Sequence, residues 1–408
     1  MNKRKIFNDP VYGFITVPTD LIFDLIEHPY FQRLRRIKQL GLAEYVYPGA
    51  LHTRFHHALG AMHLMGQALA TLRSKSHEIT ETECEAAQVA ILLHDIGHGP
   101  FSHALEHSIL SHVGHENISL QIMKALNEQM GGRLQTAIQM FEDSYPRRFF
   151  NQLISSQLDM DRMDYLNRDC FFTGVIEGAI GTERIIKMLD VTNDQLVVEA
   201  KGMLSIESFL NARRLMYWQV YLHKTCICAE TMLIQAIGRA RDLLKMGVEV
   251  WAAPDFLIFL SQEVSLQNFK DTPAYLQSFV QLDDYDVWAC LKIWTKHPDF
   301  VLSSICKMLL ERRLYKIQFS DTPFAPEKRT EISESLLGAG LGAEALPYFV
   351  VEGQSTNAAY LTSSERIFIK MKDGTVRDIA EASDLPTIKA LSNIVRKYYI
   401  CWAKNVTL

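Results

Sequence analysis

The sequence predicts a mainly α-helical protein with a smaller mixed α+β C-terminal region and a few β-hairpins. Apolar residues recur at helical spacing through most of the first 245 positions, whereas strand signals are few. Hydrophobic residues make up 48% and charged residues 22% of the 408 positions, which are globular values that allow a sizeable core. This length fits two domains of ordinary size or one large helical domain with an appendage.

Apolar spacing and capping residues place the helices along the chain. Residues 18–40 are expected to form two helices, with Thr19 as an N-cap and Pro29 as a break or a new first turn. Thr80 and Glu83 stand in capping-box spacing before a helix that runs to His94. Further helices are expected at residues 59–72, 116–130, 133–142, 146–154, 161–167 and 180–189, and along a stretch from 204 to 245.

Two segments read as β-hairpins. Residues 195–206 are expected to turn at Lys201-Gly202, and residues 366–379 at Asp373-Gly374. Between them, around residues 248–255, the helical pattern yields to a stretch of Trp, Ala and Pro. We therefore expect two parts: a helical domain of residues 1–245, and a helical and mixed region of residues 246–408 that could make oligomer or regulatory contacts.

Charge and cysteine usage exclude several classes of protein. A formal net charge of −5 and a pI near 6.3 argue against strong nucleic-acid binding. Seven scattered cysteines do not look like a disulfide framework, and Cys226 and Cys228 lack the spacing of a redox or zinc pair. The N-terminus lacks a signal peptide and no apolar run approaches about 20 residues, so we expect a cytoplasmic protein with no membrane contact.

The histidines are concentrated in one segment. Residues 52–115 hold eleven of the fourteen, and His94-Asp95 follows the apolar run VAILL at the end of a helix. A buried carboxylate beside a buried imidazole needs a partner, and a divalent cation is the usual one. Two ligands are too few for a stable site, so His57 and Asp161, on other expected helices, are the candidates that complete it.

These residues carry a resemblance. His57, His94-Asp95 and Asp161 match the H…HD…D signature of HD-domain phosphohydrolases. The strings IKQLG, YPGALHTRFHHALG, LLHDIGHGPFSH, DMDRMDYLNRD and VYLHK are similar to the deoxynucleoside triphosphate (dNTP) triphosphohydrolase branch of that family. The similarity covers roughly residues 5–245, with a patch at RRLYK (312–316), and implies an HD-domain helical core.

The resemblance implies a metal-dependent reaction. His57, His94, Asp95 and Asp161 would bind one divalent ion, which could be Mn, Fe, Zn, Ni or Mg. A cation lowers the pKa of bound water and neutralises phosphate charge, so water can attack the α-phosphate of a dNTP and release the deoxynucleoside and inorganic triphosphate. His115 matches the family's proposed general acid, although on sequence grounds it could also be a surface helix-cap residue.

Further residues match the family's site by position. Glu116 could hold the His115 ring, and His98 and His103 match histidines behind the metal or facing phosphate. Glu106 stands where the mammalian relative has aspartate, and Arg162 replaces a lysine. The expected triphosphate contacts, each of which could instead be a solvated helix-face residue, are Arg54, Arg162, Tyr165, Arg213 and Lys224.

The sugar and an activator nucleotide are matched in the same way. Gln39 and Asp169 match contacts of the 3′-hydroxyl, while Tyr221 would exclude a 2′-hydroxyl or could be one more core aromatic. A guanine-nucleotide activator site between subunits of a homodimer or homotetramer is implied by two groups of residues. These are Lys5, Asn8, Glu27, Gln32 and Arg35 near the N-terminus, and Arg312 and Lys316 in the RRLYK patch.

Two rival interpretations remain. One is an HD phosphohydrolase of another phosphate ester, such as a phosphomonoesterase or a cyclic-nucleotide phosphodiesterase. The other is a catalytically silent nucleotide-sensing or nucleic-acid-binding scaffold. None of the four predicted metal ligands is missing, and the acidic balance gives little support to broad polyanion binding.

Overall fold

The computed structural model describes residues 5–102, 104–106, 110, 113–357, 360, 366–391 and 394–404. It confirms the mainly α-helical fold class. The α-helices before residue 250 are α1 (Asp20–Glu27), α2 (Pro29–Gln32), α3 (Arg54–Ser74), α4 (Glu81–Leu93), α6 (His115–Gln129), α7 (Gln135–Phe141), α8 (Phe149–Ile154), α9 (Met160–Thr173), α10 (Thr182–Met188), α11 (Met203–Met216) and α12 (Lys224–Lys245). Those that follow are α13 (Pro254–Ser261), α14 (Leu266–Asp271), α15 (Pro273–Phe279), α16 (Asp284–Trp294), α17 (Phe300–Leu310), α18 (Pro326–Gly338), α19 (Leu346–Phe349), α20 (Ile379–Ala382) and α21 (Pro386–Ala390).

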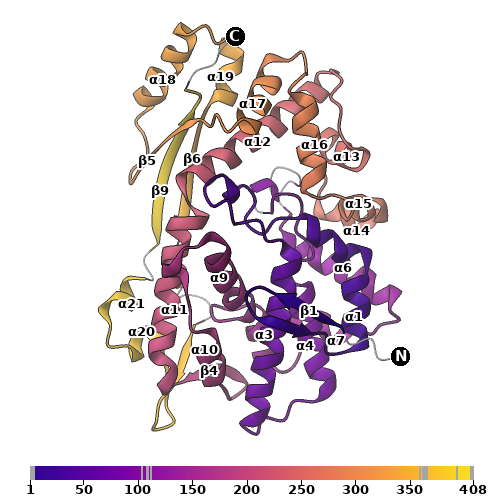
Figure 1. Cartoon of the computed structure of the whole chain (residues 1–408), viewed down its shortest axis with the longest axis vertical. Coiled ribbons are helices and arrows are strands. Elements are labelled where there is room, and N and C mark those ends of the chain that lie inside the picture. Colours follow the sequence, from indigo (N-terminus) through magenta and orange to yellow (C-terminus); the bar gives the residue numbers. More distant parts are fainter. Residues whose placement is uncertain are drawn as a thin grey trace.

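The strands form three small sheets. An N-terminal hairpin pairs β1 (Ile6–Asp9) with β2 (Gly13–Thr16). The second sheet has the order β3 (Leu189–Thr192), β4 (Gln195–Glu199), β7 (Phe368–Lys370), β8 (Val376–Asp378). The third has the order β5 (Lys316–Ser320), β9 (Val395–Trp402), β6 (Val350–Asn357). In Figure 1 the strands of this third sheet run beside α12, while the indigo and purple helices α1, α3, α4, α6 and α7 gather in the lower half.

The capping predictions are confirmed. Thr19 accepts the N–H of Ile22 at 3.3 Å, and Pro29 opens α2. The Thr80 hydroxyl accepts the N–H of Glu83 at 3.1 Å while the Glu83 carboxylate accepts the N–H of Thr80 at 2.8 Å, which completes a capping box. The helices therefore begin where local sequence places them.

The hairpin at residues 366–379 is confirmed, but the one at 195–206 is wrong. The chain turns instead at Asn193-Asp194, where φ is 51° and 61°, so that β4 pairs back onto β3. Asn and Asp tolerate this left-handed conformation, which a two-residue hairpin requires. Lys201-Gly202 belongs to a 3₁₀ turn (Ala200–Gly202) that leads into α11.

The expected stretch from 204 to 245 is interrupted. Between α11 and α12 lies a π-helical turn (Tyr217–Tyr221), and His223 then caps α12 by accepting the N–H of Thr225 at 3.1 Å. π-turns insert one residue into a helix and often occur at functional sites. Shorter 3₁₀ turns lie at Arg33–Arg36, Ala43–Tyr45, Ile176–Gly178 and Ala343–Ala345.

One hydrophobic core runs through the described residues, and most residues of α3 are buried in it. This helix packs against α4 and α9. Small residues of the helix, such as Ala58 and Ala61, are fully buried in these contacts. The same core extends past residue 245, and β4 pairs in parallel with β7 at Val198↔Ile369. The division at residues 245 and 246 stays a prediction. In the described part of the chain, no helix combines the length and apolarity needed to cross a membrane.

Candidate metal centre and active site

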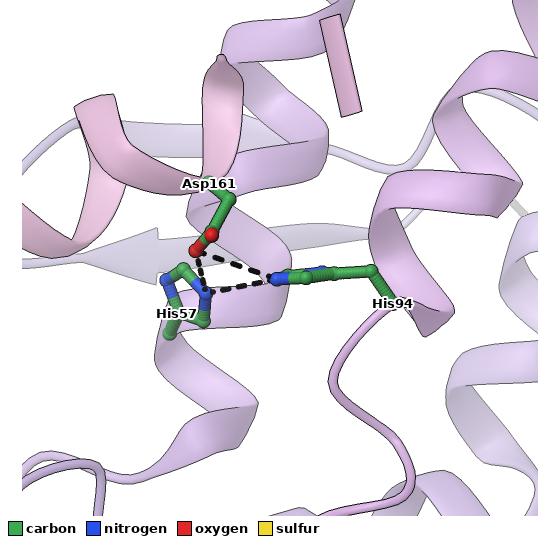
Figure 2. Close-up of side chains that lie close together, drawn as sticks. All are labelled: His57, His94 and Asp161. Carbon is green, nitrogen blue, oxygen red and sulfur yellow. Dashed lines mark hydrogen bonds and ion pairs between the residues drawn. The ribbon is translucent and has the colours of Figure 1, made fainter. Parts of the chain in front are cut away.

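Four titratable side chains from three helices converge on one point. His57 lies in α3, His94 caps the end of α4 with Asp95 next to it, and Asp161 lies in the first turn of α9. The Nε2 atom of His57 is 3.4 Å from Nε2 of His94, 3.2 Å from the Asp161 carboxylate and 3.7 Å from the Asp95 carboxylate. His94 Nε2 lies 3.4 Å from each of these two carboxylates. Figure 2 shows His57, His94 and Asp161 pointing at one another.

The second nitrogen of each ring is already engaged. His57 Nδ1 donates to the Asp164 carboxylate at 2.7 Å, and His94 Nδ1 donates to the carbonyl of Ile91 at 2.6 Å. An acceptor at Nδ1 fixes a proton there and makes Nε2 the nitrogen that can bind a metal, which is the arrangement of metal-bound histidines. Both Nε2 atoms are directed at the shared point.

A buried ion-pair chain holds Asp164 in place. Arg168, one turn further along α9, donates to both Asp164 oxygens at 2.9 and 3.0 Å, and to Asp9 of β1 at 2.7 Å. Only glycine fits at position 60 of α3, because a Cβ there would lie 1.9 Å from the Asp164 carboxylate. Gly60 thus lets α9 approach α3 closely enough for Asp164 to reach His57.

The donor set fits a divalent cation. Ligand atoms about 2.0–2.2 Å from a shared cation lie about 3–3.6 Å from one another. The separations here run from 3.2 Å to 3.7 Å, close to that range. Burial opposes a charged His57 ring, but hydrogen bonds to Asp161 and Asp164 outweigh it and raise the pKa of His57 to about 10. The nearby His57 and His94 rings likewise hold the pKa of Asp161 well below its usual range. This cluster of carboxylates therefore favours positive charge, as a proton or as a metal.

Protons and metal compete for this cluster, so metal affinity should depend on pH. With the His57 pKa near 10, the free site carries a proton on Nε2 throughout the neutral range, and binding must displace it. We expect the apparent Mn²⁺ affinity to rise by about tenfold or more per pH unit between pH 6 and 8. Isothermal titration in buffers of different ionisation enthalpy checks the number of protons released. A flat profile would contradict the assignment.

Asp95 is also held from outside the cluster. Arg54, the first residue of α3, pairs with the Asp95 carboxylate through Nη1 and donates from Nε to the Ser102 hydroxyl at 2.7 Å. Its side chain is only 2% exposed. The predicted triphosphate contact at Arg54 is therefore engaged in orienting Asp95, and its contact with phosphate stays a prediction.

His115 lies at the edge of the cluster, at the start of α6. Its ring stacks on His98 with centroids 3.8 Å apart, and its Nε2 lies 3.9 Å from the Asp95 carboxylate. The Glu106 carboxylate is 2.8 Å from His115 Nδ1 and accepts the His115 N–H at 2.7 Å. A Cβ on Gly97 would lie 2.3 Å from the His115 carbonyl, so glycine permits the approach of α6. Nε2 is thus the nitrogen that faces the cluster.

The structure separates the two glutamates proposed around His115. Glu106 contacts the ring, whereas Glu116 is exposed in the first turn of α6. The contact with the ring that the sequence assigned to Glu116 is made by Glu106, which also accepts the backbone N–H at the start of α6. His103 lies outside the described residues. Burial, followed by the charge of Arg54, lowers the pKa of His98 well below its usual value, so this ring is neutral.

Comparison with known proteins agrees with this geometry. Residues 54–169 match the family model of the HD domain, and residues 180–249 match that of an HD associated region. The crystal structure of a phosphohydrolase from Bacteroides thetaiotaomicron superposes with a TM-score of 0.94 at 51% identity, over 98% of this chain and 99% of that one. The chain belongs to the HD-domain phosphohydrolase family. HD domains bind divalent metals, in keeping with the converging histidines and carboxylates.

Two curated relatives extend the comparison. The uncharacterised protein YwfO of Bacillus subtilis is 33% identical over 323 residues, which are 78% of this chain and 72% of that protein. A Dictyostelium discoideum protein named as a deoxynucleoside triphosphate triphosphohydrolase SAMHD1 homolog is 30% identical over 62% of this chain. The chain spans about half the length of the relatives that carry the SAMHD1 name.

The predicted triphosphate contacts of this HD phosphohydrolase lie mainly on α9 and α11. Arg162 pairs with Asp159, the N-cap of α9, and leaves its buried Nε without a partner among the described residues. Arg213 is 6% exposed, and its buried Nε and Nη1 likewise have no partner in the described chain. Tyr165 lies within electrostatic reach of both arginines. Two guanidinium groups therefore keep N–H donors available for an anion.

The predicted sugar residues form a connected group. Tyr221, in the π-helical turn, donates to Asp169 at 2.8 Å, and His52 Nε2 lies 2.7 Å from the other Asp169 oxygen. The His52 carbonyl accepts the N–H of Gln39 at 3.0 Å, and the buried Gln39 Oε1 has no partner in the described structure. The chain thus links all three residues through His52, which the sequence reasoning did not single out.

A separate cavity of about 410 Å³ gathers basic side chains. Lys224 lies in its wall together with Arg312 and Lys316, so the structure groups Lys224 with the predicted activator residues. Lys404 adds a fourth cation, and none of the described lining residues is acidic. This cavity can accept a polyanion.

The N-terminal group of predicted activator residues lies elsewhere. Lys5 pairs with Glu27 at 3.4 Å, and Arg35 donates to Gln32 at 2.9 Å, while Asn8 is exposed on β1. In Figure 1 this region, near α1 and β1, lies on the opposite side of the view from β5, which begins at Lys316. Among the described residues, no hydrogen bond or ion pair joins the two groups.

Proposed function

We propose that this HD phosphohydrolase hydrolyses a dNTP to the deoxynucleoside and inorganic triphosphate. The observation that carries the proposal is the convergence of His57, His94, Asp95 and Asp161, with His115 at 3.9 Å from the Asp95 carboxylate. The names of the SAMHD1 relatives, which are deoxynucleoside triphosphate triphosphohydrolases, support the choice of substrate.

The four converging side chains would hold the divalent cation. When bound, the cation supplies Lewis-acid charge for the phosphate and lowers the pKa of water. His57 and His94 orient their Nε2 lone pairs through Asp164 and Ile91, and Arg54 orients Asp95. The chain thus presents a preformed set of ligands in a buried place.

His115 would supply the proton that the leaving group needs. Attack of water on the α-phosphate expels the 5′-oxygen of the deoxynucleoside, which must be protonated to leave as a neutral hydroxyl. Glu106 engages Nδ1, so Nε2 is the nitrogen from which a proton would pass on the side of the cluster. Arg162 and Arg213 would bind the triphosphate with their unpaired N–H groups.

The deoxyribose would contact Gln39, Asp169 and Tyr221, which are connected through His52. Gln39 offers an unpaired buried acceptor, and Asp169 offers carboxylate lone pairs, to a 3′-hydroxyl. Tyr221 is anchored by its hydrogen bond to Asp169, so its ring cannot swing away from a ribose 2′-hydroxyl without breaking that bond. This arrangement favours deoxynucleotides by sterics.

Product analysis tests the proposal. The purified protein is incubated with each dNTP and Mn²⁺ or Mg²⁺, and the products are resolved chromatographically. Deoxynucleoside with intact triphosphate is the expected pair. Deoxynucleoside monophosphate with pyrophosphate would contradict it, and turnover only of phosphomonoesters or cyclic nucleotides would favour another HD activity. No turnover with an intact metal centre would favour a nucleotide-sensing scaffold.

We also propose that a guanine nucleotide activates an oligomer of this chain. The tetracationic cavity of Lys224, Arg312, Lys316 and Lys404 suits its phosphates, and a second subunit would have to supply the distant N-terminal group. GTP is expected to raise the molar mass measured by light scattering and to increase dNTP turnover. Arg312→Glu should abolish both effects and leave Mn²⁺ binding unchanged. GTP-independent mass and turnover would contradict regulation.

A further inference from the structure

One buried carboxylate of the C-terminal half reaches the loops around the metal centre. Asp284 is the first residue of α16 and is 2% exposed. One of its oxygens accepts the N–H of Phe101 at 2.7 Å, and the other accepts the N–H of Lys38 at 2.9 Å. Asp284 thus fastens two segments that lie far apart in sequence. No sequence motif pointed to it.

The segment that Asp284 holds has an unusual backbone. Phe101 and Ser102 have φ values of 56° and 52°, which residues other than glycine rarely adopt. The Ser102 hydroxyl donates to the carbonyl of Lys38 at 3.0 Å. The N–H of Lys38 is therefore bound by Asp284 and its carbonyl by Ser102, so the two loops and α16 form one closed junction.

This junction is connected to the metal cluster. The Ser102 hydroxyl accepts from Arg54 Nε at 2.7 Å, and the same guanidinium pairs with Asp95. From Asp284 to Asp95 every link is a hydrogen bond or a chain neighbour, and the interacting side chains are buried. Displacing the left-handed turn would move the Ser102 hydroxyl and release Arg54.

Burial of the Asp284 carboxylate is unfavourable for its charged form. Burial raises the pKa of Asp284 to about 6, and the two backbone N–H donors oppose that shift. A buried carboxylate persists where its hydrogen bonds fix a geometry. Arg33 also holds the loop between Asp95 and Ser102, because it donates to the carbonyls of Ile96 and His98.

We propose that Asp284 is a positioning residue, through which the C-terminal half of the chain sets the orientation of the metal-binding carboxylate Asp95. The inference rests on the proposed metal centre and adds to it a residue outside the matched HD domain. It acts through the Ser102 hydroxyl and the Arg54 guanidinium and touches neither metal nor substrate.

The test compares Asp284→Asn with Asp283→Asn in the full chain, with Mn²⁺ as the probe. Asparagine at 284 keeps the shape but leaves one acceptor for two N–H donors. Asp283, next to it, caps α16 and pairs with Arg36, and asparagine retains the cap. We expect Mn²⁺ affinity, measured by EPR titration, to fall about 5- to 10-fold for Asp284→Asn and to stay within twofold for Asp283→Asn.

A double-mutant cycle separates positioning from general loosening. Ser102→Ala should lower the Mn²⁺ affinity to a similar degree. The affinity of the double variant should not fall below that of the single variant with the larger loss. Additive losses, or a loss equal to that of Asp283→Asn, would overturn the proposal. If Asp284→Asn does not fold, unchanged Mn²⁺ affinity in Ser102→Ala overturns it equally. Because Mn²⁺ binding is measured without substrate, failure of dNTP hydrolysis in the unaltered protein is a distinguishable result.

Discussion

His94→Ala is expected to bind no Mn²⁺ at micromolar concentration and to lose about 10³-fold or more of dNTP turnover. The imidazole supplies one of four donors, and its loss leaves His57 as the single nitrogen ligand beside the carboxylates of Asp95 and Asp161. Metal content after dialysis and turnover of each dNTP measure the two losses together.

His63→Ala is the matched control for this change. His63 also lies on α3, but it is half-buried, and its Nε2 contacts Gln67 at 2.9 Å rather than any of the four ligands. Mn²⁺ binding and turnover should stay near those of the unaltered protein. Equal losses in His63→Ala, or full activity in His94→Ala, would remove the basis for the metal centre.

The second large effect is expected at His115. His115→Gln should lose about 10²- to 10⁴-fold of turnover because the leaving oxygen then lacks its proton donor. Mn²⁺ binding should persist, since His115 is not among the four converging ligands. The ratio of turnover to bound metal therefore distinguishes a proton donor from a ligand.

The two glutamates near His115 provide an internal comparison. Glu106→Gln should lower turnover by about tenfold or more, because the carboxylate at Nδ1 holds the ring in its orientation. Glu116→Gln should change turnover by less than about twofold, since exposed charges contribute little. The reverse order of effects would restore the original expectation for Glu116 and contradict the observed contact.

Some features were predictable from local sequence because local physics decides them. The capping box of Thr80 and Glu83 and the turn at Asp373-Gly374 depend only on nearby residues. The buried run before His94 is also local. It is apolar along its whole length, and burial beside a histidine and an aspartate was enough to indicate a cation.

Other features depended on which segments meet. Asp164 and Arg168 follow Asp161 by three and seven residues, so all three lie on one face of a helix. This spacing could have predicted that Asp164 and Arg168 belong to the site. Nothing local distinguishes Glu106 from Glu116, because the choice is made by the close approach of Gly97 to α6. The wrong prediction of a hairpin turn at Lys201-Gly202 has the same origin. The strand that pairs with β4 is β3, which precedes β4 in the chain, so the turn lies before β4 and not after it.

The sequence by itself determined the helical class, the histidine-rich segment and the four candidate ligands, because residue type and spacing along a helix are local properties. Only the tertiary structure decided that these ligands share one point and that Nδ1 of each histidine is engaged. It alone joined Asp284 to the loop behind Asp95. Such contacts join residues up to 246 positions apart, and their energies exist only after the helices have packed.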